Sequence, residues 1–134
     1  MSLNRHQMRE SAFKMIFAQS VNPDADPEEL KKQVLEEFHE ADVADPFLNN
    51  LVTGVQENES AINDTISKEL KAGWTVKRLA NPDRVILQIG TYEIKYTEIP
   101  NSVAINEALE LAKKYTDEKA RKFINGVLSN VAKD

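Results

Sequence analysis

The sequence contains no cysteine, only four glycines and five prolines, and no long run of apolar residues. The absence of cysteine excludes disulfide bonds and thiolate metal ligands, and it is consistent with a reducing cytoplasm. No apolar stretch reaches the roughly 18 residues that a membrane-spanning helix requires, and the N-terminal residues lack the apolar core of a secretory signal. We therefore expect a cytoplasmic protein without a membrane span.

The sequence also offers little for catalysis or for cofactor binding. Its two histidines, His6 and His39, lie far apart and lack the spacing of a metal-binding motif such as HExxH. No glycine-rich loop could cradle a phosphate group, and no serine has a neighbouring partner that would mark it as a nucleophile. We predict no catalytic residue, no metal site and no cofactor.

Charge is distributed unevenly along the 134 residues, whose formal net charge is −5. Between Asn22 and Glu69 there are 13 acidic residues against three basic ones, whereas residues 1–20 and 113–122 are locally basic. The net charge argues against nucleic-acid binding, but such asymmetry can mark a polyanion-binding face on an acidic molecule. A solvated surface with uneven charge explains the same pattern, so composition alone leaves both interpretations open.

What the sequence does contain is helical periodicity in nearly every segment, with prolines at the joints. No segment alternates apolar and polar residues long enough to predict a strand. The first helix is expected over about residues 4–20, a fourth over about 59–72, and the last over about 117–132. The pattern predicts an all-α protein of about seven helices, one of them short, with a possible division near Gly73.

Residues 81–97 are apolar over most of the circumference of a helix. Val85 and Ile89 share one face, whereas Leu87 and Ile94 point the other way. A helix that is apolar on most sides is usually buried, so we expect this segment to be a central helix wrapped by its neighbours. Asn81 is the expected N-cap, and Pro82 suits the first helical position.

Glu93 is the one unusual carboxylate of this central helix, because it falls among apolar positions. A lone buried carboxylate is costly unless it is paired or hydrogen-bonded. One interpretation is an ion pair with Arg84, Arg78 or a lysine that holds helices together. The other is a contact with a protein partner, and the sequence leaves both open.

Basic and aromatic side chains occur together on the first and last predicted helices. The first carries Arg5, His6, Arg9 and Phe17, and the last carries Lys119, Arg121, Lys122 and Phe123. Single-stranded RNA is typically held by Lys and Arg contacts to phosphates and by bases stacked on aromatic rings. If the two helix starts meet, they form one basic platform with two stacking surfaces. Alternatively, Phe17 and Phe123 are half-buried packing residues.

Four stretches of the sequence are distinctive: DRVILQIGTYE, IPNSVAINEALELAKKY and KFINGVL in the second half, and RHQMRESAFKMIFAQ at the start. Together they resemble the NusB transcription antitermination family, whereas residues 21–72 match it only as helices of suitable number and length. The resemblance implies an all-helical domain of two three-helix bundles, over about residues 1–72 and 74–134, that share the central buried helix.

The resemblance also implies a function. The family binds the boxA segment of nascent ribosomal RNA transcripts together with NusE, a small-subunit ribosomal protein. The complex joins other Nus factors on RNA polymerase and suppresses premature termination, without catalysis or a cofactor. A similar helical domain is appended to some rRNA cytosine methyltransferases, but this chain holds no methyl-donor domain, so we expect no such chemistry from it.

Carried over by position, the family's arginine-rich opening matches Arg5 and Arg9, and its two aromatic positions match Phe17 and Phe123. The resemblance thus implies that Arg5, Arg9, Lys119 and Lys122 neutralise phosphates while Phe17 and Phe123 stack on bases. His6 stands in the same RNA-binding segment, where members with a dense arginine run carry more charge. We therefore expect weaker intrinsic RNA affinity and greater dependence on NusE.

The expected NusE contacts lie on the central helix, at Asp83, Tyr92 and Glu93. Ribosomal proteins are commonly basic, and the acidic surface of this chain suits such a partner. A competing hypothesis is a helical adaptor that binds basic proteins through its acidic middle and has no RNA-binding activity of its own.

Overall fold

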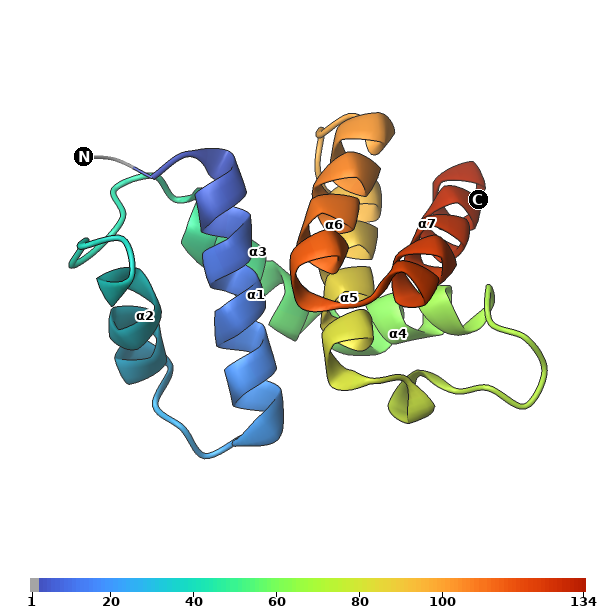
Figure 1. Ribbon diagram of the computed structural model, residues 1–134, viewed down its shortest axis with the longest axis horizontal. Helices are drawn as coiled ribbons and strands as arrows, with labels where there is room; N and C mark the ends of the chain where they lie inside the picture. The colour runs from blue at the N-terminus through green and yellow to red at the C-terminus, as the bar shows by residue number, and fades with distance from the viewer. Residues whose placement is uncertain (1–2) are drawn as a thin grey trace. The chain divides into compact units, whose positions relative to one another are not determined.

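The computed structural model describes residues 3–134, and this part of the chain is all-helical, as predicted (Figure 1). Its seven α-helices and one short 3-10 helix are α1 (Arg5–Val21), α2 (Pro27–Glu36), α3 (Phe47–Glu57), α4 (Glu59–Ser67), η1 (Val76–Arg78), α5 (Asn81–Tyr96), α6 (Asn101–Tyr115) and α7 (Glu118–Lys133). No strand occurs over the same residues. None of these helices is both long and apolar enough to cross a membrane.

Side-chain caps fix where several helices begin. At α1, Asn4 Oδ1 accepts from the Gln7 backbone N–H at 2.8 Å, while Gln7 Oε1 accepts from the Asn4 N–H at 2.9 Å. This capping box satisfies two donors that the first helical turn leaves unpaired. Asp117 caps α7 in a related way, because its Oδ1 accepts from the Ala120 N–H at 2.8 Å.

The start of α5 differs from the prediction by one residue. Ala80 is the N-cap and makes no side-chain cap, and Asn81 is already helical. The Asn81 side chain instead accepts a hydrogen bond from Arg84 Nη2 at 2.5 Å. The proline that follows is tolerated because the first helical turn has no backbone acceptor for its missing N–H.

The helices belong to two compact units, which divide between Gln56 and Glu57. The sequence predicted a later division, near Gly73, with the fourth helix in the amino-terminal part. In the structure α4 ends at Ser67 and packs against α5, α7 and η1, so it belongs to the second unit. Gly73 adopts a positive φ of 88°, which suits glycine because it has no Cβ.

The first unit contains α1, α2 and α3, and its core is aliphatic. The buried apolar side chains are Leu3, Met8, Ala12, Phe13, Met15 and Ile16 around α1, Leu35 on α2, and Leu48, Leu51 and Val55 on α3. Ion pairs at its surface join Lys14 to Glu37 and, at 2.7 Å, Lys31 to Asp42. The hydrogen bond from Lys31 lowers the pKa of the Asp42 carboxyl.

The second unit is built around α5, which contacts α4, α6 and α7. Val85, Ile86, Leu87 and Ile89 are all buried, so the prediction of a central buried helix is confirmed. Figure 1 shows α6 and α7 beside α5. A hydrogen bond of 3.0 Å from Gln88 to Asn63 ties the same helix to α4.

Candidate nucleic-acid interface

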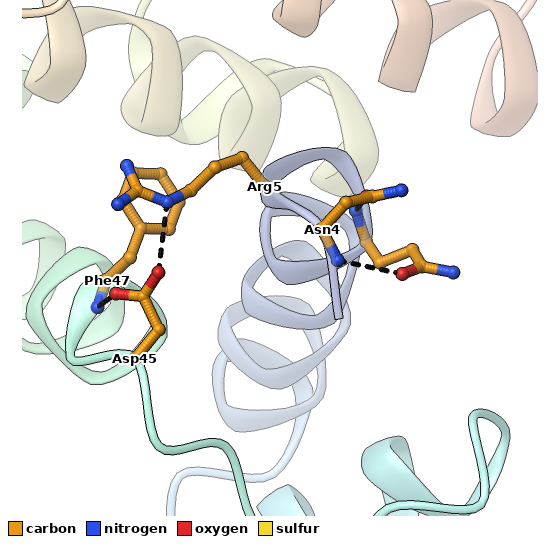
Figure 2. Close-up of polar contacts among 5 residues, drawn as sticks. Asn4, Arg5, Asp45 and Phe47 are labelled. Atoms are coloured by element: carbon orange, nitrogen blue, oxygen red, sulfur yellow. Dashed lines mark hydrogen bonds and ion pairs between the residues drawn. The ribbon is translucent and has the colours of Figure 1, made fainter. Parts of the chain in front are cut away.

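Arg5 lies at the start of α1 and is held by two residues from the start of α3 (Figure 2). Its Nε donates to Asp45 Oδ2 at 3.2 Å. Its guanidinium carbon lies 4.3 Å from the centroid of the Phe47 ring, a distance typical of a cation–π contact. The Arg5 side chain nevertheless remains 56% exposed, so it is accessible to a phosphate.

Asp45 is placed by a second hydrogen bond, in which its Oδ1 accepts from the Phe47 backbone N–H at 2.9 Å. This contact satisfies a donor at the beginning of α3, as Asp commonly does at helix starts. The two carboxylate oxygens therefore have separate partners, one on the helix backbone and one on Arg5 (Figure 2). The local fold of α3 fixes the position at which Arg5 is held.

Arg9 follows Arg5 by one helical turn and reaches the same ring. Its guanidinium carbon lies 5.0 Å from the Phe47 centroid. Unlike Arg5, Arg9 is buried, with only 4% of its surface exposed. The structure thus brings the two predicted phosphate-binding arginines together at one aromatic side chain, but it presents only Arg5 to solvent.

The remaining candidates on α1 have different environments. His6 is exposed, whereas Phe17 is half-buried. The Phe17 ring lies 6.0 Å from that of Phe13 at an interplanar angle of 33°, so part of its surface packs within the unit. Part of the Phe17 ring is therefore used for packing, and its role in stacking on a base stays a prediction.

The start of α7 carries the second group of candidates, and all of them are exposed. Lys119 and Lys122 lie away from the face on which α7 buries Ile124 and Leu128, and Phe123 lies at the edge of that face. Lys122 forms only a long, exposed ion pair of 3.7 Å with Glu118, and Arg121 is exposed beside it. Phe123 is 38% exposed, which is unusual for a large aromatic residue and leaves ring surface available for stacking.

The candidates are thus divided between the two units. Arg5, His6, Arg9 and Phe17 belong to the first unit, and Lys119, Lys122 and Phe123 belong to the second. Within each unit the structure places basic and aromatic residues on one helix. A single platform made from both helix starts stays a prediction.

The predicted contacts for a protein partner all lie on α5, but their exposure differs. Tyr92 is half-buried and stacks on Tyr96, with ring centroids 5.5 Å apart. Burial, together with the like charge of Asp117, raises the pKa of the half-exposed Asp83. Glu93 is only 1% exposed, so Asp83 and Tyr92 are the accessible members of this set.

The contacts that Phe47 and Asp45 make with Arg5 were not predicted from the sequence. Arg5 and Asp45 are 40 positions apart, so no local pattern connects them. No local signal in the sequence marks Phe47 as the contact of Arg5 and Arg9.

Comparison with known proteins identifies relatives over almost the whole chain. Residues 6–133 match the sequence model of the NusB family. The chain is 77% identical over 133 residues to the transcription antitermination protein NusB of Pediococcus pentosaceus, with 99% of this chain and 100% of that protein covered. It is 46% identical over 136 residues to the protein of the same description in Levilactobacillus brevis, with 100% and 96% covered.

Solved structures of similar chains agree with the fold. T. maritima NusB superposes with a TM-score of 0.87 at 36% identity, with 100% of this chain and 94% of that chain covered. A chain in a crystal structure of the antitermination factors NusB and NusE in complex with double-stranded RNA superposes with a TM-score of 0.84 at 30% identity. That match covers 96% of both chains.

Proposed function

Because this chain belongs to the NusB family, we propose that it is a transcription antitermination factor that binds boxA-type RNA together with NusE. Its RNA ligand is the single-stranded boxA segment of nascent ribosomal RNA transcripts, and the protein acts as a non-catalytic scaffold. Through NusE and other Nus factors it acts on RNA polymerase. The observation that carries this proposal is the likeness, over 96% of the chain, to a chain solved in a complex of NusB, NusE and RNA.

The RNA contacts are assigned to the exposed basic residues at the starts of α1 and α7. Arg5, Lys119 and Lys122 are accessible to phosphates, and His6 follows Arg5 on α1. Arg9 is assigned a less direct role, because it is buried and its guanidinium lies against Phe47. Phe123 and the exposed part of Phe17 supply stacking surfaces for bases.

The NusE contact is assigned to α5, where Asp83 and Tyr92 are accessible and Glu93 is buried beside Tyr92 in the sequence. The net charge of −5 suits a basic ribosomal protein, because complementary charge speeds association and selects partners. The same acidic charge opposes RNA, which makes a combined surface with NusE the more favourable RNA-binding state.

A titration of boxA RNA, with and without NusE, tests this function. If about four phosphates are contacted, log K should fall with log salt at a slope near −3 for a single strand. NusE should tighten the binding. Lys32→Ala, on the exposed surface of α2, provides a control that leaves RNA affinity unchanged.

Two results would overturn the proposal in different ways. RNA binding that is absent, or that does not depend on salt, would remove the RNA-binding function. Tight binding of NusE with no gain in RNA affinity would leave the alternative function, a protein adaptor without RNA-binding activity.

A further inference from the structure

Phe47 contacts both α1 arginines, an arrangement that the proposed function does not require. The guanidinium carbons of Arg5 and Arg9 are 4.3 Å and 5.0 Å from the centroid of its ring. Two like charges beside one aromatic ring repel each other, and the ring quadrupole partly offsets this repulsion. The two guanidinium groups therefore meet at one ring of the first unit.

The contacts with Phe47 and Asp45 restrain the Arg5 side chain but engage only part of its hydrogen-bonding capacity. Over residues 3–134 the structure records one hydrogen bond from its guanidinium, donated by Nε to Asp45. Asp45 holds the guanidinium through Oδ2 alone, while its Oδ1 accepts from the Phe47 N–H (Figure 2). The terminal nitrogens of Arg5 therefore remain available for a bidentate contact with a phosphate, the geometry that guanidinium favours.

We infer that Phe47 is a positioning residue for RNA binding: it holds the Arg5 guanidinium in advance in the orientation that receives a phosphate. This inference rests on the proposed function. A free arginine side chain loses rotamer freedom when it binds a phosphate, and prior restraint removes part of that entropic cost. Phe47 provides the restraint without adding charge, whereas Asp45 carries the same sign of charge as the phosphate and repels it.

Phe47→Leu and Phe47→Tyr, each in the wild-type and Arg5→Ala backgrounds, test this role by titration with boxA RNA. Phe47→Leu should weaken binding 3-fold to 10-fold, about 0.7–1.4 kcal/mol, and Phe47→Tyr should stay within about 2-fold of the wild type because it keeps the ring. In the Arg5→Ala background, Phe47→Leu should have no further effect. The net charge is the same in the Phe47 variants, so a loss of affinity cannot come from lost charge.

A measurement on the wild-type protein keeps the inference testable even if Phe47→Leu does not fold. The ring current of Phe47 should displace the proton resonances of the Arg5 side chain in the free protein, and the displacement should persist in the RNA complex. Random-coil Arg5 resonances in the complex would overturn the inference.

The outcomes separate this inference from the function on which it rests. Wild-type protein that does not bind boxA RNA would overturn both. Wild-type binding that Phe47→Leu leaves unchanged would overturn the positioning role alone. An equal loss of affinity in the wild-type and Arg5→Ala backgrounds would show that Phe47 acts only through the fold, and would also overturn it.

Discussion

A methyl group placed on Gly90 would lie 2.7 Å from Cδ1 and 3.0 Å from Cδ2 of Leu128. The same methyl group would be 3.5 Å from Cβ of Ala108. Gly90 is therefore the place where α5 approaches both α6 and α7 closely. Leu128 and Ala108 are themselves buried, so the neighbours have little room to move away.

Gly90→Val should destabilise the protein by about 1–3 kcal/mol, since extra volume in a packed core forces strained side chains and backbone shifts. The β-branched side chain brings two methyl groups toward Leu128, which outweighs the gain in helix propensity over glycine. Chemical unfolding in urea, with the midpoint and slope both fitted, measures the change.

Gly126 provides the matched control on α7, because nothing lies within 4 Å of a Cβ added there. Gly126→Ala should stabilise the protein by about 0.5–1 kcal/mol, the usual gain from replacing glycine inside a helix. Opposite signs for the two substitutions are expected, and a stabilising Gly90→Val would contradict the close packing of α5.

Thr91 leads to a second prediction about stability. Its side chain is fully buried, and its Oγ1 has no hydrogen-bond partner within residues 3–134. An unsatisfied buried hydroxyl costs about 1–3 kcal/mol, so Thr91→Val should stabilise the protein by about 1 kcal/mol. Thermal unfolding monitored by circular dichroism should show a midpoint a few degrees higher than in the wild type.

Thr97 is the control for this substitution, since its hydroxyl is used. Its Oγ1 donates to the Glu93 carbonyl at 2.6 Å and accepts from the Ile99 N–H at 3.2 Å. Thr97→Val should therefore lower the free energy of unfolding by about 1 kcal/mol. If Thr91→Val instead lowered the free energy of unfolding, as Thr97→Val should, the hydroxyl of Thr91 would have to be satisfied.

Much of the fold could be predicted because its signals are local. Residues 81–97 are apolar on most sides, and this pattern by itself identified α5 as a buried helix. The starts of α1 and α7 lie close to the expected residues 4 and 117, and in the structure Asn4 and Asp117 each cap an N–H group three positions further along the chain. The exposure of Phe123 was predictable for the same reason, because it sits at the edge of an amphipathic stripe.

The features that could not be predicted depend on contacts between distant segments. α4 has an apolar stripe that suits either unit, and only its packing against α5 and α7 assigns it to the second. The burial of Arg9 and its contact with Phe47 likewise require α1 and α3 to be placed side by side. Periodicity reports which face of a helix is apolar, but not which partner covers that face.

Asp83 should make stability depend on pH. Burial and the charge of Asp117 raise its pKa above the ordinary value of 3.8. The folded protein therefore binds this proton more tightly than the unfolded chain, so the contribution of Asp83 to stability is greatest below its ordinary pKa and is lost as pH rises through the folded value. Asp83→Asn, which does not titrate, should gain in melting temperature relative to the wild type between about pH 3 and about pH 6.

The measurement is a series of thermal unfolding curves for both proteins across that pH range. The difference in melting temperature, variant minus wild type, should rise with pH and then level off. When Asp117→Asn is introduced into both proteins, the rise should be smaller, because the like charge that helps to raise the pKa of Asp83 is removed. A difference that stays constant, or that falls with pH, would contradict the raised pKa.

Substitution of Phe123 should affect RNA affinity alone, whereas substitution of Phe17 should affect both RNA affinity and stability. Loss of a base-stacking ring costs about 1–3 kcal/mol, so Phe123→Ala should weaken boxA binding by that amount. Because Phe123 is exposed, the substitution should leave the melting temperature close to that of the wild type. Phe17→Ala should weaken binding and also lower stability, since its ring packs against Phe13.

Salt dependence separates stacking from charge in these variants. Neither phenylalanine neutralises a phosphate, so both alanine variants should keep the wild-type slope of log K against log salt. Lys122→Ala is the contrasting variant, and it should reduce the slope by about 0.7 because one phosphate contact is lost. Wild-type affinity in Phe123→Ala would remove stacking from the start of α7, whereas an altered slope would mean that the substitution disturbs the neighbouring lysines.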